Sequence, residues 1–339
     1  MRYQHMKTYS MNIVALSIIS IMLSSPVSAS ASDWDHSTLN QERGQGNDGT
    51  FWATVEGQSS TNSAAFRYPY AECAIGSHQS PIAINLTANL IPLTLNPITH
   101  SSDKNPPAEP ERRADSLMVR YAPSISSTEG ANIGKNQGNA YVFRNTGHAI
   151  QVSFSAGYPG RLVIGKDVYP LVQFHFHTPS EHLIIKGQYS AGHQYDGELH
   201  FVHQREDGKL AVLGIFLDGS HGSAVENPIL KKIIEHTPEE HDTYNTSGAG
   251  LLLDPSRLIP TDNEQVFTYA GSLTTPPCSE GVSWYVMSEP LKISPSQIRE
   301  LSEFFTLKNN RIVQNTNSRT VEIHKDLHMG HDHDHQGRW

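Results

Sequence analysis

Two histidines spaced two residues apart, His175 and His177, are the residues whose types and spacing first suggest chemistry. They lie in the apolar segment 171–177, which is typical of a β-strand, so both imidazoles extend from one face while Phe174 and Phe176 extend from the other. Two imidazoles on one face can bind the same metal ion. The pair alone is a weak indication, because exposed strands often carry two solvated histidines.

A third histidine, His200, lies in the segment 198–203, which is also typical of a strand. Residues 186–197 contain three glycines and can turn the chain back. An antiparallel pairing of 198–203 with 171–177 would then bring His200 beside the first two histidines. Three nitrogen ligands that leave one coordination position open are typical of a catalytic zinc ion, because structural zinc is closed by four protein ligands.

The elements that must position these residues are mostly strands. Strand patterns, rich in Val, Ile, Phe and Leu and bounded by Gly, Asn or Asp, occur at 141–154, 171–177, 198–203 and 210–217. The last of these is apolar on both faces and should be a central, covered strand. Helical patterns are few, with the better ones at 227–236 and 294–305. The sequence therefore predicts one mostly β (α+β) domain with peripheral short helices.

Residues 1–29 are typical of a secretory signal peptide. Arg2 and Lys7 precede an apolar run, 11–23, which small residues follow. The alternative is a membrane anchor, but the run is shorter than the roughly 20 apolar residues that a span needs. We expect an exported protein without a membrane span in the mature chain, located in the periplasm or outside the cell.

Composition limits the partners of the chain. Its 339 residues carry a net charge of −9 and form no basic patch, so binding to nucleic acid is not expected. Cys73 and Cys278 are its only cysteines, and an even count in an exported chain favours one disulfide over two separate buried thiols. The oligomeric state stays open.

Several blocks of sequence resemble the alpha-class carbonic anhydrases of the exported, bacterial type. They are QFHFHTPSEH (173–182), ELHFVH (198–203), LAVLGIFL (210–217) and GSLTTPPCSEGVSW (271–284), with HQSPI (78–82) and NTGHAI (145–150). The resemblance implies a catalytic domain at 66–323, built on a central, largely antiparallel twisted sheet. A divergent N-terminal arm, 30–65, would precede it, and the stretch 183–197 would be an enlarged loop.

The resemblance also implies roles for single residues. The zinc ligands would be His175, His177 and His200, and the side chains that orient two of them would be Gln173 and Glu198. Thr274 would accept a hydrogen bond from a zinc-bound hydroxide and donate one to Glu181. Carbon dioxide would rest against Val202, Val212, Leu273 and Trp284, where Thr275 either contacts bicarbonate or only shapes the loop. His148 would carry the proton to buffer, whereas His182 and His203 are expected to make structural hydrogen bonds.

The implied reaction is the reversible hydration of carbon dioxide to bicarbonate by a zinc enzyme. Three alternatives stay open at this stage: a zinc esterase, a catalytically silent relative that acts as a binding module, and a metal-handling protein. The last rests on the stretch 324–339, which holds five histidines and is predicted to be a flexible tail.

Overall fold

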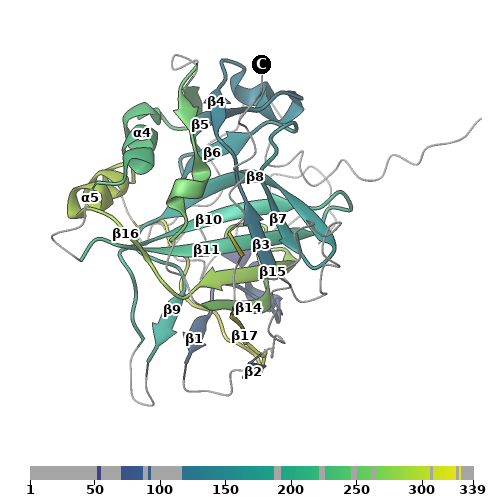
Figure 1. Ribbon diagram of the computed structural model, residues 1–339. Coiled ribbons are helices and arrows are strands. Elements are labelled where there is room, and N and C mark those ends of the chain that lie inside the picture. The colour runs from purple at the N-terminus through teal and green to yellow at the C-terminus, as the bar shows by residue number, and fades with distance from the viewer. Residues whose placement is uncertain are drawn as a thin grey trace, which may run out of the picture.

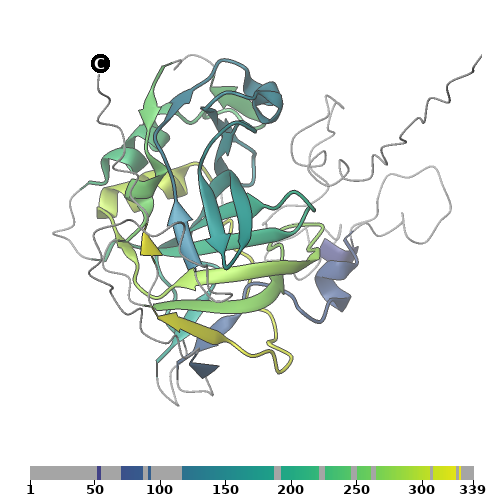
Figure 2. The same cartoon turned by 45° about the vertical axis from the view of Figure 1, so that its right-hand side comes forward.

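The computed structural model describes residues 52–54, 70–86, 91–92, 117–186, 192–220, 226–245, 250–260, 265–305, 308–325 and 328–329. Strands dominate this part of the chain, and a large twisted sheet runs through the molecule with the helices outside it (Figures 1 and 2). The predicted mostly β fold with peripheral short helices is confirmed. The predicted signal peptide lies outside the described residues, as does nearly all of the predicted N-terminal arm.

The helical elements are short: η2 Trp52–Thr54, α3 Glu72–Ile75, η3 Gly130–Lys135, α4 Pro228–His236, η4 Pro255–Leu258 and α5 Pro295–Glu303. The strands in the first half are β1 Ala83–Asn85, β2 Ile91–Pro92, β3 Leu117–Arg120, β4 Ser124–Ser126, β5 Ala140–Asn145, β6 Ile150–Phe154, β7 Arg161–Ile164, β8 Asp167–His177 and β9 Leu183–Ile185. The remaining strands are β10 Gly197–Gln204, β11 Leu210–Asp218, β12 Thr243–Asn245, β13 Leu252–Leu253, β14 Gln265–Ser272, β15 Glu280–Met287, β16 Leu291–Lys292, β17 Glu322–Lys325 and β18 His328–Met329. Among the described helices, none is long and apolar enough to cross a membrane.

The main sheet is mixed, and its central path runs in the order β13-β4-β5-β6-β8-β10-β11-β15-β14-β17-β2. At its centre β8 and β10 are antiparallel, and their register sets His200 opposite His175. This is the pairing that the sequence predicts. β11 then pairs antiparallel with β10 and parallel with β15.

Alternation along the central strands sorts their side chains onto two cores. Phe174, Phe176, Leu199 and Phe201 belong to the larger apolar cluster on one face of the sheet. On β11, the odd-numbered residues from Ala211 to Leu217 join the same cluster, while Val212 and Phe216 join a second cluster. β11 is therefore covered on both faces, as predicted. The face of β8 and β10 that carries the histidines lies on the side of the second, smaller cluster.

Two helices, α4 and α5, lie side by side outside the sheet (Figure 1). Each begins at a capping residue followed by proline: Asn227 caps α4, and Ser294 forms a capping box with Gln297 on α5. The caps also join the helices, because Gln297 Oε1 accepts from the backbone N–H of Asn227 at 2.9 Å. Both helices lie within the predicted ranges.

Two contacts between residues far apart in the sequence hold the segments that contain Cys73 and β1. Cys73 and Cys278 form the predicted disulfide, which spans 205 residues. β9, from the enlarged loop, pairs with β1 in a separate two-stranded sheet.

At the C-terminal end, the first residues of the predicted tail pair with strands: residues 324 and 325 belong to β17, and residues 328–329 form β18 on β3. The reason is physical: β14 would otherwise expose an unpaired edge, and Ile323 packs against the smaller core. Residues 330–339 lie outside the description.

Candidate metal centre

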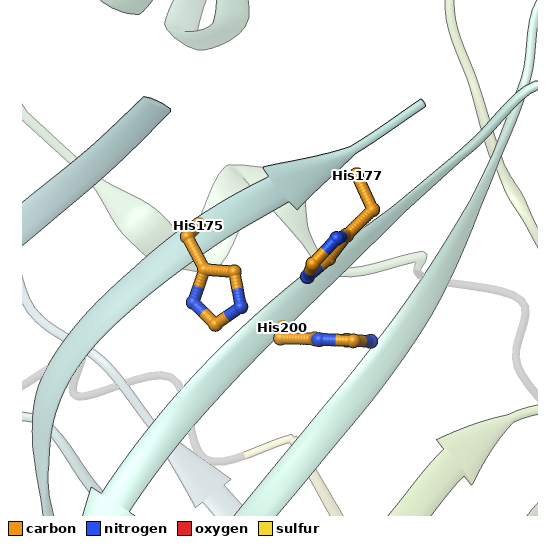
Figure 3. Close-up of side chains that lie close together, drawn as sticks. All are labelled: His175, His177 and His200. Atoms are coloured by element: carbon orange, nitrogen blue, oxygen red, sulfur yellow. The ribbon is translucent and has the colours of Figure 1, made fainter. Parts of the chain in front are cut away.

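Three imidazoles converge at the centre of the sheet. His175 and His177 extend from one face of β8, and His200 extends toward them from β10 (Figure 3). One nitrogen of each ring lies within 4.8 Å of the corresponding nitrogens of the other two. The ring centroids are 4.7 to 5.3 Å apart. Strand alternation and register alone bring the three together, so they can hold a metal ion.

The second nitrogen of two of these rings is bonded to the side chain that the sequence predicts. Nδ1 of His175 donates to Oε1 of Gln173 at 2.9 Å, and Nε2 of His200 donates to Oε1 of Glu198 at 2.9 Å. Each partner precedes its histidine by two residues and therefore shares its strand face. The bonds leave Nε2 of His175 and Nδ1 of His200 as the nitrogens with free lone pairs.

The third ring is oriented by a residue that the sequence reasoning missed. Nδ1 of His177 donates to the backbone carbonyl of Asn309 at 2.8 Å, and Asn309 lies 132 positions further along the chain. Nε2 of His177 is buried and has no hydrogen-bond partner among the described residues. A buried polar atom of this kind normally has a partner, so this nitrogen indicates a ligand. A backbone acceptor has no side-chain signature, which is why sequence patterns did not reveal Asn309.

The electrostatics favour neutral rings. Burial lowers the pKa of His177 to about 4 and holds the pKa of His175 well below its usual value, to which the neighbouring imidazoles contribute. Burial also lowers the pKa of His200. Neutral imidazoles keep the lone pairs that a metal needs, and a set of three suits a borderline cation such as Zn²⁺. The residues therefore fit zinc.

The Glu198 carboxylate is buried and accepts four hydrogen bonds. Oε1 accepts from His200 and from Nδ1 of His182, and Oε2 accepts from the backbone N–H groups of Glu181 and His182. Burial raises the pKa of Glu198, but the two histidines outweigh burial and hold it well below its usual range. His182 also bonds Tyr269 through Nε2, in keeping with the structural role expected for it. Glu198 is thus a fixed negative charge behind the third ring.

A second buried carboxylate, Glu181, lies against the histidines. Its Oε1 accepts from the backbone N–H of Arg311 at 2.8 Å, and its Oε2 is 3.8 Å from Nδ1 of His200. Burial raises the pKa of Glu181 to about 7, although interactions with His200, Arg311 and the Thr274 side chain lower it in part. Oε2 accepts no hydrogen bond from the described part of the chain. Glu181 and Thr274 are therefore neighbours.

The residues predicted to form an apolar wall lie together. Val202, Val212 and Trp284 belong to the smaller core cluster, and the partly buried Leu273 packs against it. The Trp284 ring lies 4.8 Å from the His200 ring, centroid to centroid, so this wall adjoins the metal centre. The backbone carbonyl of Thr275 accepts from the N–H of Cys278, which shapes the loop.

His148 is half-buried in the turn between β5 and β6. Its backbone N–H donates to Oγ1 of Thr146, and its carbonyl accepts from Nδ2 of Asn309 at 3.0 Å. The same Asn309 holds His177, so the turn that carries His148 is joined to the metal centre through one residue.

The sequences and solved structures that resemble this chain include several carbonic anhydrases. Residues 114–325 match the family model described as eukaryotic-type carbonic anhydrase. A carbonic anhydrase of Nostoc sp. (strain PCC 7120) is 35% identical over 252 residues, which are 74% of this chain and 78% of the relative. The alpha-carbonic anhydrase of Thermovibrio ammonificans, solved with the inhibitor sulfanilamide, is 32% identical with a TM-score of 0.60, over 81% of this chain and 95% of that chain. A dioscorin complexed with ascorbate is also similar, at 26% identity and a TM-score of 0.57, over 76% and 90% of the two chains.

Proposed function

Because the chain belongs to the eukaryotic-type, or alpha-class, carbonic anhydrase family, we propose that it hydrates carbon dioxide reversibly to bicarbonate and a proton. The observation that carries the proposal is the set of three converging imidazoles, each with its other nitrogen bonded to an acceptor. A site of three neutral nitrogens leaves one coordination position of the metal open, since a structural zinc site would need a fourth protein ligand.

The metal would be zinc, held by Nε2 of His175, Nε2 of His177 and Nδ1 of His200. A zinc ion so bound lowers the pKa of a coordinated water to about 7, the value known for carbonic anhydrases generally, and so supplies hydroxide near neutral pH. Gln173, Glu198 and the carbonyl of Asn309 keep the three rings in one tautomer and one orientation.

Thr274 and Glu181 would orient the nucleophile. Glu181 has an acceptor atom, Oε2, that the described residues leave unbonded, and the Thr274 side chain interacts with this carboxylate. A hydroxyl that donates its proton to Glu181 can only accept from the attacking oxygen, which fixes the direction of that oxygen's remaining lone pair. This pair of residues therefore aims the attack.

Carbon dioxide has no charge to bind, so an apolar surface beside the nucleophile is sufficient. Val202, Val212, Leu273 and Trp284 supply such a surface next to His200. The proton released in each cycle would leave through His148, because imidazole is the side chain that exchanges protons near neutral pH. Its partly exposed turn supports this role.

We further propose that the protein works outside the cytoplasm, in the periplasm. The Cys73–Cys278 disulfide supports export, because disulfides persist in oxidising compartments. Among other functions, the similarity to a dioscorin is the observation that favours a binding module. The presence of all three converging histidines favours the enzyme instead. Whether the His-rich end handles metal concerns residues that lie mainly outside the described part of the chain.

Stopped-flow hydration of carbon dioxide, with and without a chelator, tests the proposal. We expect one zinc per chain and rapid hydration that the chelator abolishes and added zinc restores. His200→Ala should lose both the zinc and the activity, because two imidazoles cannot retain the ion. Ester hydrolysis that exceeded carbon dioxide hydration would favour the esterase, and full hydration by the metal-free protein would overturn the proposal.

A further inference from the structure

Arg311 is fully buried, yet the proposed chemistry gives its guanidinium no part. Its Nη1 donates to Oε1 of Gln79 at 3.0 Å and to the carbonyl of Ser80 at 2.7 Å, and its Nη2 donates to the carbonyl of Cys73 at 2.8 Å. The guanidinium also lies over the ring of Trp52, 5.5 Å from the centroid. Three acceptors in fixed positions therefore determine where this side chain lies.

The backbone of the same residue contacts the proposed machinery. The N–H of Arg311 donates to Oε1 of Glu181 at 2.8 Å, which leaves Oε2 as the atom available to Thr274. A backbone N–H cannot adjust by rotating a side chain, so it can hold Glu181 only if residue 311 itself is held. Burying a cation is costly unless it is well bonded, and this one is bonded on two of its nitrogens.

We propose that Arg311 is a positioning residue, whose guanidinium holds its own backbone N–H against Glu181 and so orients Glu181 toward Thr274. The inference rests on the proposed function, since it assigns Arg311 a part in that reaction. Without the anchored guanidinium, residue 311 would shift, Glu181 would lose one hydrogen bond, and the orientation of Thr274 would loosen.

The hydrogen bonds of the Arg311 guanidinium connect it to both cysteines of the disulfide, to one directly and to the other through Gln79. Cys73 supplies a carbonyl to Arg311 directly, and Gln79 donates from Nε2 to the carbonyl of Cys278 at 3.0 Å. Cys278 follows Thr274 by four residues. The frame formed by the disulfide, Gln79 and Arg311 therefore supports both members of the Thr274–Glu181 pair.

Arg319 is a matched control. Its guanidinium also caps backbone carbonyls, those of Ala270 at 3.0 Å and Gln79 at 2.7 Å, and it also lies over an aromatic ring, that of Tyr269. Within the described part of the chain, no hydrogen bond of Arg319 goes to Glu181. Its loss should remove comparable bonds from the same region, including one to the backbone of Gln79, while the hydrogen bonds of Glu181 and of the Arg311 guanidinium stay in place.

The test compares Arg311→Met, Arg311→Lys and Arg319→Met in the zinc-loaded full-length protein. We expect Arg311→Met to keep one zinc per chain while kcat/KM falls on the order of 10-fold to 100-fold, as misplacement of a catalytic group typically does. Lysine should fall between, because its single nitrogen cannot occupy both positions from which Nη1 and Nη2 of the guanidinium reach the three acceptors. Arg319→Met should lower the melting temperature and leave kcat/KM unchanged.

Two further measurements separate positioning from general damage. In a Thr274→Ala background, Arg311→Met should add little further loss of kcat/KM, because the relay is already broken. A crystal structure of Arg311→Met should show Oε1 of Glu181 more than 3.5 Å from the backbone nitrogen of residue 311.

The inference is overturned if that contact keeps its length, if the loss is equally large in both backgrounds, or if Arg319→Met loses as much kcat/KM. If Arg311→Met does not fold, the lysine variant decides by the same criteria. A wild-type protein without chelator-sensitive hydration would overturn the proposed function instead, and the crystal structure would still decide the positioning role.

Discussion

His203 should make the stability of this protein fall in mild acid. The ring is completely buried, with Nε2 accepting from the Tyr121 hydroxyl at 2.8 Å and Nδ1 donating to the carbonyl of Ala211 at 3.2 Å. Burial lowers the pKa of His203 to about 3, although its bonds to backbone carbonyls oppose that shift. The neutral ring therefore fits the folded state, whereas the unfolded chain takes up a proton near pH 6.5.

The sign and the size of the change in stability follow from the difference between the folded and the unfolded pKa of His203. The stabilisation is complete above the unfolded pKa of about 6.5 and is lost as the pH falls from there toward 3, because the unfolded state binds the proton first. Between pH 7 and pH 5 the loss is about 2 kcal/mol for this one group. At pH 5 this value depends on the unfolded pKa and hardly on the folded one, since the folded ring is still neutral.

Urea unfolding of the wild type and of His203→Gln at pH 7 and pH 5 measures the effect. The free energy of unfolding of the variant should fall by about 2 kcal/mol less than that of the wild type over this range. His236→Gln is the control, because the half-buried His236 also bonds a backbone carbonyl, that of Lys232. Equal pH dependence of the wild type and His203→Gln would refute the reasoning.

Three further predictions concern the proposed site. Thr274→Ala should retain zinc and lose on the order of 10²-fold in hydration rate, because an oriented hydrogen bond is lost; a zinc-replete variant with the wild-type rate in stopped flow would exclude the relay. Replacing Cys73 and Cys278 by serine should lower the free energy of unfolding by about 5 kcal/mol, the chain-entropy value for a bridge that spans 205 residues; an unchanged urea midpoint would contradict it. His148→Ala should lower kcat in weak buffer, recover with added imidazole and keep kcat/KM; an equal fall in both constants would indicate damage to the zinc site instead.

Much of the metal centre follows from local periodicity. Alternation on one strand places Gln173, His175 and His177 together, and the same rule places Glu198 with His200. The register between the strands follows because a slip of one residue would turn the phenylalanines away from the larger core. The sequence predicts these features well because Phe174, Phe176, Leu199 and Phe201 are apolar and must face the larger core, which fixes the direction of the remaining side chains.

Other parts of the site have no local signal. The acceptor for His177 is a backbone carbonyl at Asn309, and the donor to Glu181 is a backbone N–H at Arg311. Every residue offers a backbone carbonyl, and every residue except proline a backbone N–H, so only the three-dimensional path of the chain reveals these partners. The strand at residues 322–325 was missed for a similar reason, since its partner β14 is distant in sequence and its composition is polar.

The dependence of His177 on Asn309 and of Glu181 on Arg311 also determines when the centre can form. The two contacts join residues 132 and 130 positions apart, and the disulfide beside them spans 205. A chain that emerges from its N-terminus onward cannot complete the centre until residue 311 has appeared, long after the last of the three histidines at position 200. Contacts of such long range form slowly, because loop closure precedes their stabilisation. We therefore expect the oriented set of three nitrogens to be complete only after these contacts have formed, and a chain shortened before residue 309 would carry all three histidines but lack the carbonyl that orients His177.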